Sequence, residues 1–161
     1  MNPKQRKSLD KTDYAILDAL QHDGRITITE LSRKVNLSAT PCAERMKSLE
    51  QQGYIKGYRA ELDPTLLSLS LLVFVEISLL RTSPDVFDEF RVAVRKLPQV
   101  LECHLVSGSF DYLVKARVAD MAAYRTLLGE TLLTLPGVSD SRTYVVMEEV
   151  KETRVLPIKH G

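Results

Sequence analysis

The sequence predicts an α+β protein with a small all-helical part followed by a larger part in which strands and helices alternate. In the first third, apolar residues recur at helical spacing in three short segments. The rest reads as strand, helix, strand, strand, helix, strand. An internal repeat supports this order, because the segment LPQV at 97–100 returns 38 positions later as LPGV at 135–138. We therefore expect two βαβ halves in the second part.

Three short helices are expected before residue 54. The first has Asp10 as its N-cap and ends near Gly24. The second begins with a capping box, in which the side chains of Thr27 and Glu30 each bond the other residue's amide. Ser38 is expected to cap the third helix, whose apolar stripe consists of Cys42, Met46 and Leu49.

The second part is expected to contain four strands and two helices. The predicted elements are a strand at 71–80, a helix at 85–96, strands at 100–107 and 112–118, a helix at 120–134 and a strand at 138–147. This order is typical of a ferredoxin-like fold, in which both helices cover one face of the sheet. A second copy of the domain is the simplest cover for the other face. The tail at 150–158 is a candidate for an additional strand.

The predicted domains follow from these elements. Residues 1–58 form a helix-turn-helix, winged-helix-like domain, residues 59–69 a linker, and residues 70–161 the ferredoxin-like domain. Within the linker region, residues 54–62 are compatible with either a small hairpin or an extended chain around Gly57.

Composition narrows the class of protein. The chain has 161 residues, 44% of them hydrophobic and 27% charged, with a formal net charge of +1. These values are typical of a globular protein, and no apolar run approaches the ~20 residues that cross a bilayer. Without a signal-peptide core, we expect a cytoplasmic protein. Two cysteines and three scattered histidines predict neither a disulfide framework nor a metal site.

The helices at 27–35 and 39–52, joined by the turn at 36–38, have the proportions of a helix-turn-helix motif. The start of the second helix of such a motif enters the major groove of DNA, so residues off the apolar stripe are candidates for DNA contact. Thr40 and Arg45 can bond base edges, and the amides near Ser38 suit a phosphate. The full set of candidates is Arg25, Ser38, Ala39, Thr40, Pro41, Glu44, Arg45, Lys47 and Ser48, with Arg33, Lys34, Lys56, Arg59 and the tail residues Lys4, Arg6 and Lys7 as further phosphate contacts.

A second candidate site is the turn GSFDY at 108–112. Gly108 permits a tight turn or a close backbone approach to a ligand, and Asp111 is a lone carboxylate between apolar strands. Backbone amides could hold the carboxylate of an α-amino acid and Asp111 its ammonium. An ordinary hairpin with an aspartate bonded to its own turn explains the same residues. No nucleophile elbow, phosphate-binding loop or HExxH motif is present, so we expect no enzyme.

Taken together, these residues resemble the Lrp/AsnC family of bacterial and archaeal transcription regulators over essentially the whole chain. The motifs that carry the resemblance are Leu9-Asp10-x-x-Asp13-x-x-Ile16-Leu17, Asp23-Gly24-Arg25, Glu30-Leu31-Ser32, Val35-Asn36-Leu37-Ser38, Arg45-Met46-Lys47-Ser48-Leu49-Glu50-x-x-Gly53-Tyr54-Ile55, Gly108-x-x-Asp111-Tyr112 and Leu135-Pro136-Gly137-Val138.

The resemblance implies an N-terminal DNA-binding domain and a C-terminal domain that binds an effector and forms oligomers. It implies homodimers that assemble further, often to octamers, and an amino acid effector bound between dimers, with genes of amino acid metabolism as targets. Apolar neighbours favour leucine or another aliphatic amino acid. The effector residues that it implies are Leu105, Gly108, Asp111, Met121, Leu133, Tyr144, Val145 and Val146.

A function of a different class is also compatible with the sequence. A small-molecule sensor could use its helical domain to bind a protein instead of DNA, since the ferredoxin-like fold serves many functions. The outer face of the helix at 39–52 discriminates between the two, because a protein-binding helix exposes an apolar patch there. A DNA reader would instead expose polar and basic residues. A dimer of the DNA-binding form would read half-sites about one helical turn, ~34 Å, apart.

Overall fold

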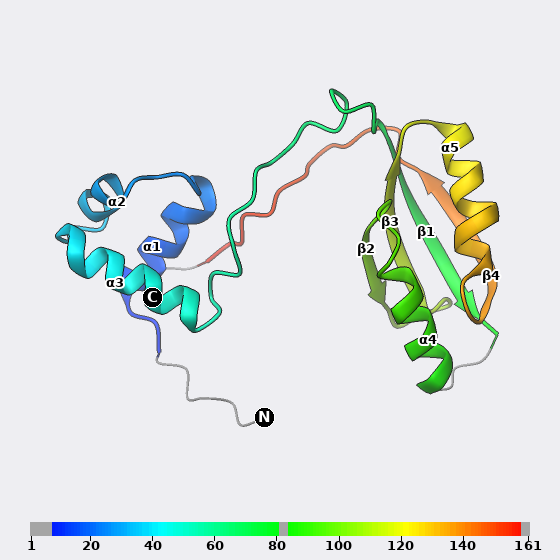
Figure 1. The fold of residues 1–161 in the computed structure, drawn as a ribbon, viewed down its shortest axis with the longest axis horizontal. Coiled ribbons are helices and arrows are strands. Elements are labelled where there is room, and N and C mark those ends of the chain that lie inside the picture. The colour runs from blue at the N-terminus through cyan, green and yellow to red at the C-terminus, as the bar shows by residue number, and fades with distance from the viewer. Residues whose placement is uncertain (1–7, 81–83, 159–161) are drawn as a thin grey trace. The chain divides into compact units, whose positions relative to one another are not determined.

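The computed structural model describes residues 8–80 and 84–158, and it divides the chain into two compact units (Figure 1). One unit contains the chain up to Glu61 together with the segment that begins at Lys151, and the other spans Leu62–Val150. The predicted division placed the tail with the second part. The structure groups it with the first unit, because the backbone of Leu156 pairs with the side chain of Gln21.

The N-terminal unit consists of three helices, α1 (Lys11–His22), α2 (Ile28–Lys34) and α3 (Ala39–Gln51). The expected capping box of Thr27 with Glu30 is present, and Asp10, expected as a simple N-cap, forms a second capping box with Asp13. Ser38 is the N-cap residue of α3, as expected, but its side chain forms no capping hydrogen bond. The core of this unit consists of Ile16, Ala19, Leu20, Leu31, Val35, Cys42 and Leu49.

The chain leaves α3 without forming a hairpin. Residues 54–62 are extended and belong to no strand, which decides between the two predicted alternatives. The hydroxyl of Tyr58 donates a hydrogen bond to Glu50 Oε1 over 3.1 Å, and so holds the start of this segment on α3. Burial, together with this bond to the carboxylate, raises the pKa of Tyr58 to about 12.

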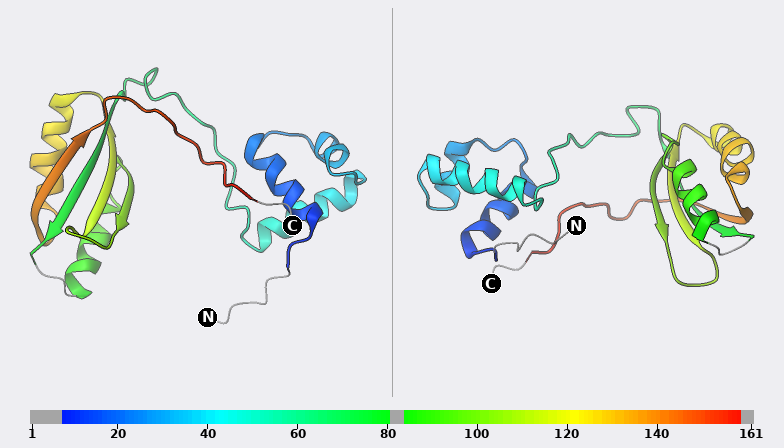
Figure 2. Two further views of the ribbon diagram at one scale, coloured as in Figure 1. Left: turned by 180° about the vertical axis from the view of Figure 1, so that it is seen from behind. Right: turned by 60° about the horizontal axis from the view of Figure 1, so that its bottom comes forward.

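The second unit has the predicted order of elements. Its strands are β1 (Leu71–Leu79), β2 (Val100–Leu105), β3 (Tyr112–Val118) and β4 (Val138–Val145), and its helices include α4 (Pro84–Val94) and α5 (Met121–Thr126). All neighbouring strands are antiparallel, in the order β2-β3-β1-β4. This is the ferredoxin-like arrangement, and both helices lie on the same face of the sheet (Figures 1 and 2).

The core of this unit lies between the sheet and the helices. Val73, Val75 and Ile77 of β1 are fully buried beneath Phe90 and its neighbours, as the alternation of the strand predicts. Gly137, in the second copy of the repeat, has φ +78°, and a Cβ there would overlap Val86 Cγ1 of α4. Position 137 therefore requires glycine for two reasons: its backbone conformation disfavours other residues, and α4 leaves no space for a Cβ.

The predicted helix at 120–134 is not one regular α-helix. After α5 the chain continues as a π-helical turn, η1 (Leu127–Thr131), and a 3₁₀ turn, η2 (Leu132–Thr134). The apolar periodicity predicts that this segment packs on the sheet, and Leu127 and Leu132 are buried. The wider π turn was not apparent from the sequence, because the change of hydrogen-bond pattern leaves apolar spacing nearly unchanged.

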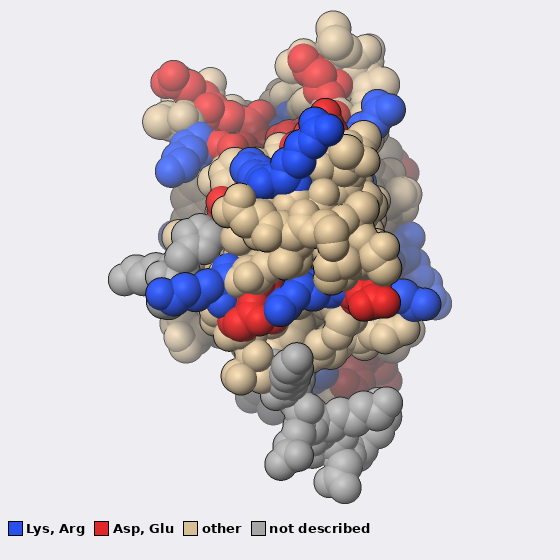
Figure 3. Space-filling model, turned by 90° about the vertical axis from the view of Figure 1, so that its left-hand side faces the viewer, with Lys and Arg blue, Asp and Glu red and all other residues tan. Residues whose placement is uncertain are grey.

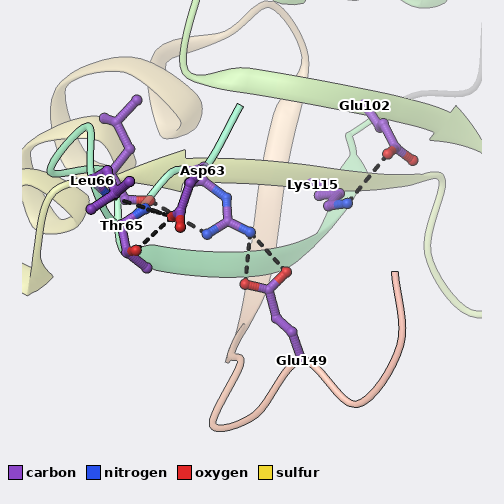
Figure 4. Close-up of polar contacts among 8 residues, drawn as sticks. Asp63, Thr65, Leu66, Glu102, Lys115 and Glu149 are labelled. Carbon is purple, nitrogen blue, oxygen red and sulfur yellow. Dashed lines mark hydrogen bonds and ion pairs between the residues drawn. The ribbon is translucent and has the colours of Figure 1, made fainter. Parts of the chain in front are cut away.

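The sheet face away from the helices carries charged and polar side chains. Lys115 Nζ lies 3.5 Å from Glu102 Oε1 on this face (Figure 4). Tyr144 donates a hydrogen bond to Glu76 Oε1 over 3.0 Å. Leu113 lies beside Lys115 on β3 and is half-buried. Within the described part of the unit, no helix covers this face.

Candidate DNA interface and effector site

The outer face of α3 is polar in the structure. Thr40, Glu44 and Lys47 are exposed and lie three or four residues apart, so they share one side of the helix. Cys42 and Leu49 are buried on the opposite side, where they pack against α1 and α2. The described α3 therefore presents no apolar patch of the kind that a protein-binding helix needs. Of the other predicted contacts, Ser38 and Ala39 are exposed, and Pro41 and Ser48 are half-buried.

Arg45 is not free on this outer face. Its Nη1 donates hydrogen bonds to Asp10 Oδ2 over 2.7 Å and to Asp13 Oδ1 over 2.8 Å. The predicted outward orientation of Arg45 is therefore wrong in this structure. The physical reason is helix geometry: position 45 lies between the exposed stripe and the core stripe, which turns its side chain toward α1.

Two carboxylates hold the guanidinium of Arg45, and they differ in burial. The side chain of Asp13 is 12% exposed, and that of Asp10 is 49% exposed. A hydrogen bond from the backbone of Asp13, and then the bond from Arg45, lower the pKa of Asp10. From its position in the sequence, Asp10 is predicted only to cap α1. An aspartate at the N-cap of α1 and another in its first turn, with an arginine on the helix that packs there, were the available signal.

The basic residues form no continuous patch on the face drawn in Figure 3, where Lys and Arg lie among Asp and Glu. Arg25, in the turn before α2, is exposed, and its amide donates to Asp23 Oδ1 over 2.9 Å. The other phosphate candidates that the structure describes are also exposed, namely Arg33, Lys34, Lys47, Lys56 and Arg59. The tail candidates Lys4, Arg6 and Lys7 lie outside the described residues.

Asp111 closes the hairpin between β2 and β3 and joins it to β1. Its Oδ2 accepts a hydrogen bond from the Leu79 amide over 2.7 Å, and its own amide donates to the Ile77 carbonyl over 3.0 Å. Its carbonyl accepts from the Val106 amide. The turn-forming interpretation of Asp111 thus has a direct structural basis. Among the described residues nothing donates to Oδ1, so one carboxylate oxygen remains for a ligand.

The turn beside Asp111 offers backbone donors. Gly108 has φ +150°, which favours glycine, while a Cβ there would meet nothing within 4 Å. The glycine therefore serves the backbone conformation and leaves open space above the turn. The amides of residues 107–110 donate to no other described residue. An anionic group could bond these amides while a cationic group approaches Asp111.

Apart from Leu105, the remaining effector candidates do not meet this turn within one chain. Leu105 ends β2, whereas Tyr144 and Val145 belong to β4 at the opposite edge of the sheet. Three strand spacings, about 14 Å, separate these edges. Met121 begins α5 and Leu133 lies in η2, away from the hairpin along the chain. All five side chains are exposed, and Val146 is half-buried. One chain therefore brings only Leu105, Gly108 and Asp111 together.

Two cavities lie near these groups, one in each unit. A cavity of about 280 Å³ opens between α1 and α3, lined by residues that include Asp13, Arg45 and Gln52. A smaller one of about 130 Å³ lies on the polar face of the sheet, lined by Glu76, Ser78, Ser109, Phe110, Asp140, Ser141 and Arg142. Over residues 8–80 and 84–158, no group of three or more acidic, histidine or cysteine side chains could hold a metal ion. No described helix is long and apolar enough to cross a membrane.

Family models match both parts of the chain. A winged helix-turn-helix DNA-binding model matches residues 9–56, and an Lrp/AsnC ligand-binding domain model matches residues 72–156. The two matches fall on the two compact units of the structure, apart from the C-terminal tail.

Individual relatives cover nearly the whole chain. The leucine-responsive regulatory protein of Escherichia coli K12 is 63% identical over 153 residues, which are 95% of this chain and 93% of that protein. The leucine-responsive regulatory protein of Haemophilus influenzae is 61% identical over 159 residues, 99% of this chain and 96% of that protein. A transcriptional regulator of Neisseria meningitidis in complex with L-Met superimposes with a TM-score of 0.90 at 42% identity, covering 95% of this chain and 99% of the other.

Proposed function

Because this chain belongs to the Lrp/AsnC family of transcription regulators, we propose that it binds DNA sequence-specifically and that an amino acid changes this binding. The observation that carries the proposal is the match of a DNA-binding model and a ligand-binding model to separate units of one chain. The protein is a regulator and not an enzyme, as its relatives are regulators. It works in the cytoplasm, where it meets DNA, and controls genes of amino acid metabolism.

The outer face of α3 is the proposed DNA-reading surface. Thr40 and Lys47 are exposed there, and the start of α3 directs free amides toward a phosphate. Arg45 acts on this surface through its bonds to Asp10 and Asp13, which set α3 against α1. The polar character of this face supports DNA over a protein as the partner of the helix.

The effector is an aliphatic amino acid, leucine or one of similar size, bound at the turn of Gly108 and Asp111. Unpaired amides of residues 107–110 suit its carboxylate, and Asp111 Oδ1 suits its ammonium. The Neisseria meningitidis regulator with L-Met supports this ligand class. The separation of Leu105 from Tyr144 and Val145 across the sheet supports a pocket completed by another chain.

The assembly is a homodimer that associates further, to an octamer. The polar sheet face has no cover within the described unit, and half-buried Leu113 and Phe74 lie on it. A domain of this size gains stability when a second copy covers such a face. An effector bound between chains then alters their packing, and with it the spacing of the α3 helices on DNA.

Genome-wide mapping of bound DNA, with and without single amino acids, tests the function. We expect discrete bound sites near genes of amino acid metabolism, and an occupancy that changes with one aliphatic amino acid. Calorimetric titration of leucine, isoleucine, valine, alanine and methionine into the pure protein identifies the effector. Uniform, sequence-independent occupancy that no amino acid alters would contradict the proposal.

A further inference from the structure

The C-terminal segment returns to the DNA-binding unit and pairs with α1. Gln21 Nε2 donates to the Leu156 carbonyl over 3.0 Å, and the Leu156 amide donates to Gln21 Oε1 over 2.9 Å. Asp18 Oδ1 accepts from the same Nε2 over 3.1 Å and fixes the carboxamide. We infer that α1 carries, at Gln21, a docking site for the chain's own C-terminal segment, and that this docking tethers the DNA-binding unit.

The local sequence suits Leu156 to this pairing. In extended backbone the amide and carbonyl of one residue point to the same side, as they do in the hydrogen-bonded pairs of an antiparallel sheet. One carboxamide can therefore pair with both groups. Pro157 disfavours the helical conformation of Leu156 and biases it toward extended backbone. The leucine side chain is 67% exposed, so the backbone carries the recognition.

The segment is also fixed where it leaves the effector-binding unit. The Val146 amide donates to the Leu72 carbonyl over 3.0 Å. Beyond it, Arg117 Nη2 lies 2.8 Å from each carboxylate oxygen of Glu149 (Figure 4). The Arg117 side chain is only 7% exposed, so the protein shields its side of this ion pair from solvent. The six residues 150–155 between the two anchors span at most about 20 Å.

The DNA-binding unit consequently has two connections to the rest of the chain. The first follows α3, where Tyr58 bonds Glu50, and the second is the segment docked at Gln21 (Figures 1 and 2). A unit held by two short segments has fewer accessible orientations than one held by a single segment. When two such DNA-binding units bind paired half-sites at once, they then lose less orientational entropy than units held by one segment would. This consequence rests on the proposed DNA-binding function, whereas the docking does not.

Hydrogen exchange of the Leu156 amide in the full-length protein measures the docking. Gln21→Leu keeps the size and helix propensity of the residue but removes both bonds. We expect exchange at Leu156, and tryptic cleavage after Arg154, to become about fivefold to tenfold faster. Gln99→Leu, at an exposed position of the other unit, is the matched control and leaves both rates unchanged. Equal rates in Gln21→Leu and wild type would overturn the docking.

A second variant tests the role of the backbone bias. Pro157→Ala leaves Gln21 intact and frees Leu156 to adopt helical backbone. We expect a smaller acceleration of Leu156 exchange, about twofold to threefold, with the melting temperature unchanged. No acceleration would show that the proline contributes nothing to docking.

Cross-linking identifies the chain that supplies the docked segment. With Cys42→Ala and Cys103→Ala as background, His22→Cys, at the exposed residue next to Gln21, and Leu156→Cys are joined by a short bis-maleimide, while Gln21 itself is kept. A product of single-chain mass supports docking within one chain. A product of double mass shows that a second copy supplies the segment, which overturns the proposal in its present form.

DNA affinity separates this inference from the proposed function. Gln21→Leu should bind DNA with two half-sites about threefold to tenfold more weakly, while its affinity for one half-site stays at the wild-type value. Faster exchange without loss of two-site affinity would overturn the tether while leaving the docking. Wild-type protein that binds no DNA would instead refute the proposed function and leave the exchange result standing.

Discussion

A single guanidinium group joins two helices of the DNA-binding unit. Arg45 of α3 bonds both Asp10 and Asp13 of α1, and Asp13 is nearly buried. A carboxylate with so little exposure depends on its cation, because the desolvation that burial imposes is otherwise uncompensated. The sequence predicts that Arg45 contacts a DNA base. In the structure, Arg45 instead fixes the position of α3 against α1.

Arg45→Ala is expected to lower the free energy of unfolding by about 1–3 kcal/mol, since it leaves Asp13 without a cation. Lys47→Ala, two positions along the same helix and fully in solvent, should change stability by no more than about 0.5 kcal/mol. Urea denaturation at neutral pH measures both. DNA binding should respond differently from stability. Lys47→Ala should weaken the binding of all DNA sequences equally and reduce the salt dependence of binding. An unfolding free energy of Arg45→Ala equal to wild type would contradict the positioning role.

Asp111 accepts a hydrogen bond from the Leu79 amide, and we propose that it also binds the effector; one substitution can separate these two roles. Asp111→Asn retains an oxygen that accepts from the Leu79 amide but removes the charge that faces the effector ammonium. We expect stability within about 0.5 kcal/mol of wild type. Effector affinity should fall by about 1.5–3 kcal/mol, roughly tenfold to a hundredfold. Asp111→Ala loses the hairpin bond as well, so it should lose stability as well as effector binding.

Calorimetric titration of aliphatic amino acids and a denaturation curve check both arms of this prediction. DNA binding without effector should survive in Asp111→Asn, because the two sites lie in separate units. Unchanged amino acid affinity in this variant would confine Asp111 to its hairpin role and move the ligand elsewhere.

The two copies of the repeat differ in packing at their third residue, which is Gln99 in the first copy and Gly137 in the second. The loop before β4 crosses close to α4, and Gly137 is where the two meet. In the first copy, Gln99 occupies the matching place and is exposed. The same sequence signal, a proline that ends a helix before a strand, therefore serves one tightly packed and one open junction.

Gly137→Ala should destabilise the protein by about 1–3 kcal/mol, because alanine disfavours φ +78° and its Cβ would overlap Val86. Gly129→Ala is the matched control, since a Cβ there meets nothing within 4 Å and its φ lies outside the left-handed region. That variant should be neutral or up to about 1 kcal/mol more stable. Thermal denaturation followed by circular dichroism compares the two. A Gly137→Ala protein as stable as Gly129→Ala would show that the close approach to α4 is absent in solution.

For the molecule as a whole, the sheet face opposite the helices is the proposed assembly surface. It combines charged pairs, such as Glu102 with Lys115, with half-buried apolar side chains. The effector candidates at the two sheet edges add to this, because they can line one pocket only when more than one chain contributes. The proposed assembly and the proposed effector response therefore depend on the same geometry.

Leu113→Glu should convert the assembled protein to a smaller species, because it places a negative charge in the middle of the face that a second copy covers. Light scattering at micromolar concentration measures the change, and the wild type should have at least the mass of a dimer. Val92→Glu, on the exposed side of α4, is the control and should retain a dimer or larger species. A wild type that is monomeric at this concentration would refute the covered face.

Local features of this protein were determined by sequence alone. The N-cap at Asp10, the capping box at Thr27, the alternation along β1 and the proline-ended repeats each involve residues that are near neighbours in the chain. Such interactions need no knowledge of the rest of the fold. They sufficed for the order of all elements and hence for the ferredoxin-like topology.

Only the tertiary structure decided how side chains distant in sequence pair. Arg45 meets Asp10 and Asp13, Asp111 meets Leu79, and Gln21 meets Leu156, in each case across more than 30 positions. Hydrogen bonds act over about 3 Å, so these pairings depend on the packing of whole elements and leave no periodic signal in the chain. The same reason explains why the effector candidates, gathered by family resemblance, lie on opposite sheet edges: strand order is a property of the folded sheet.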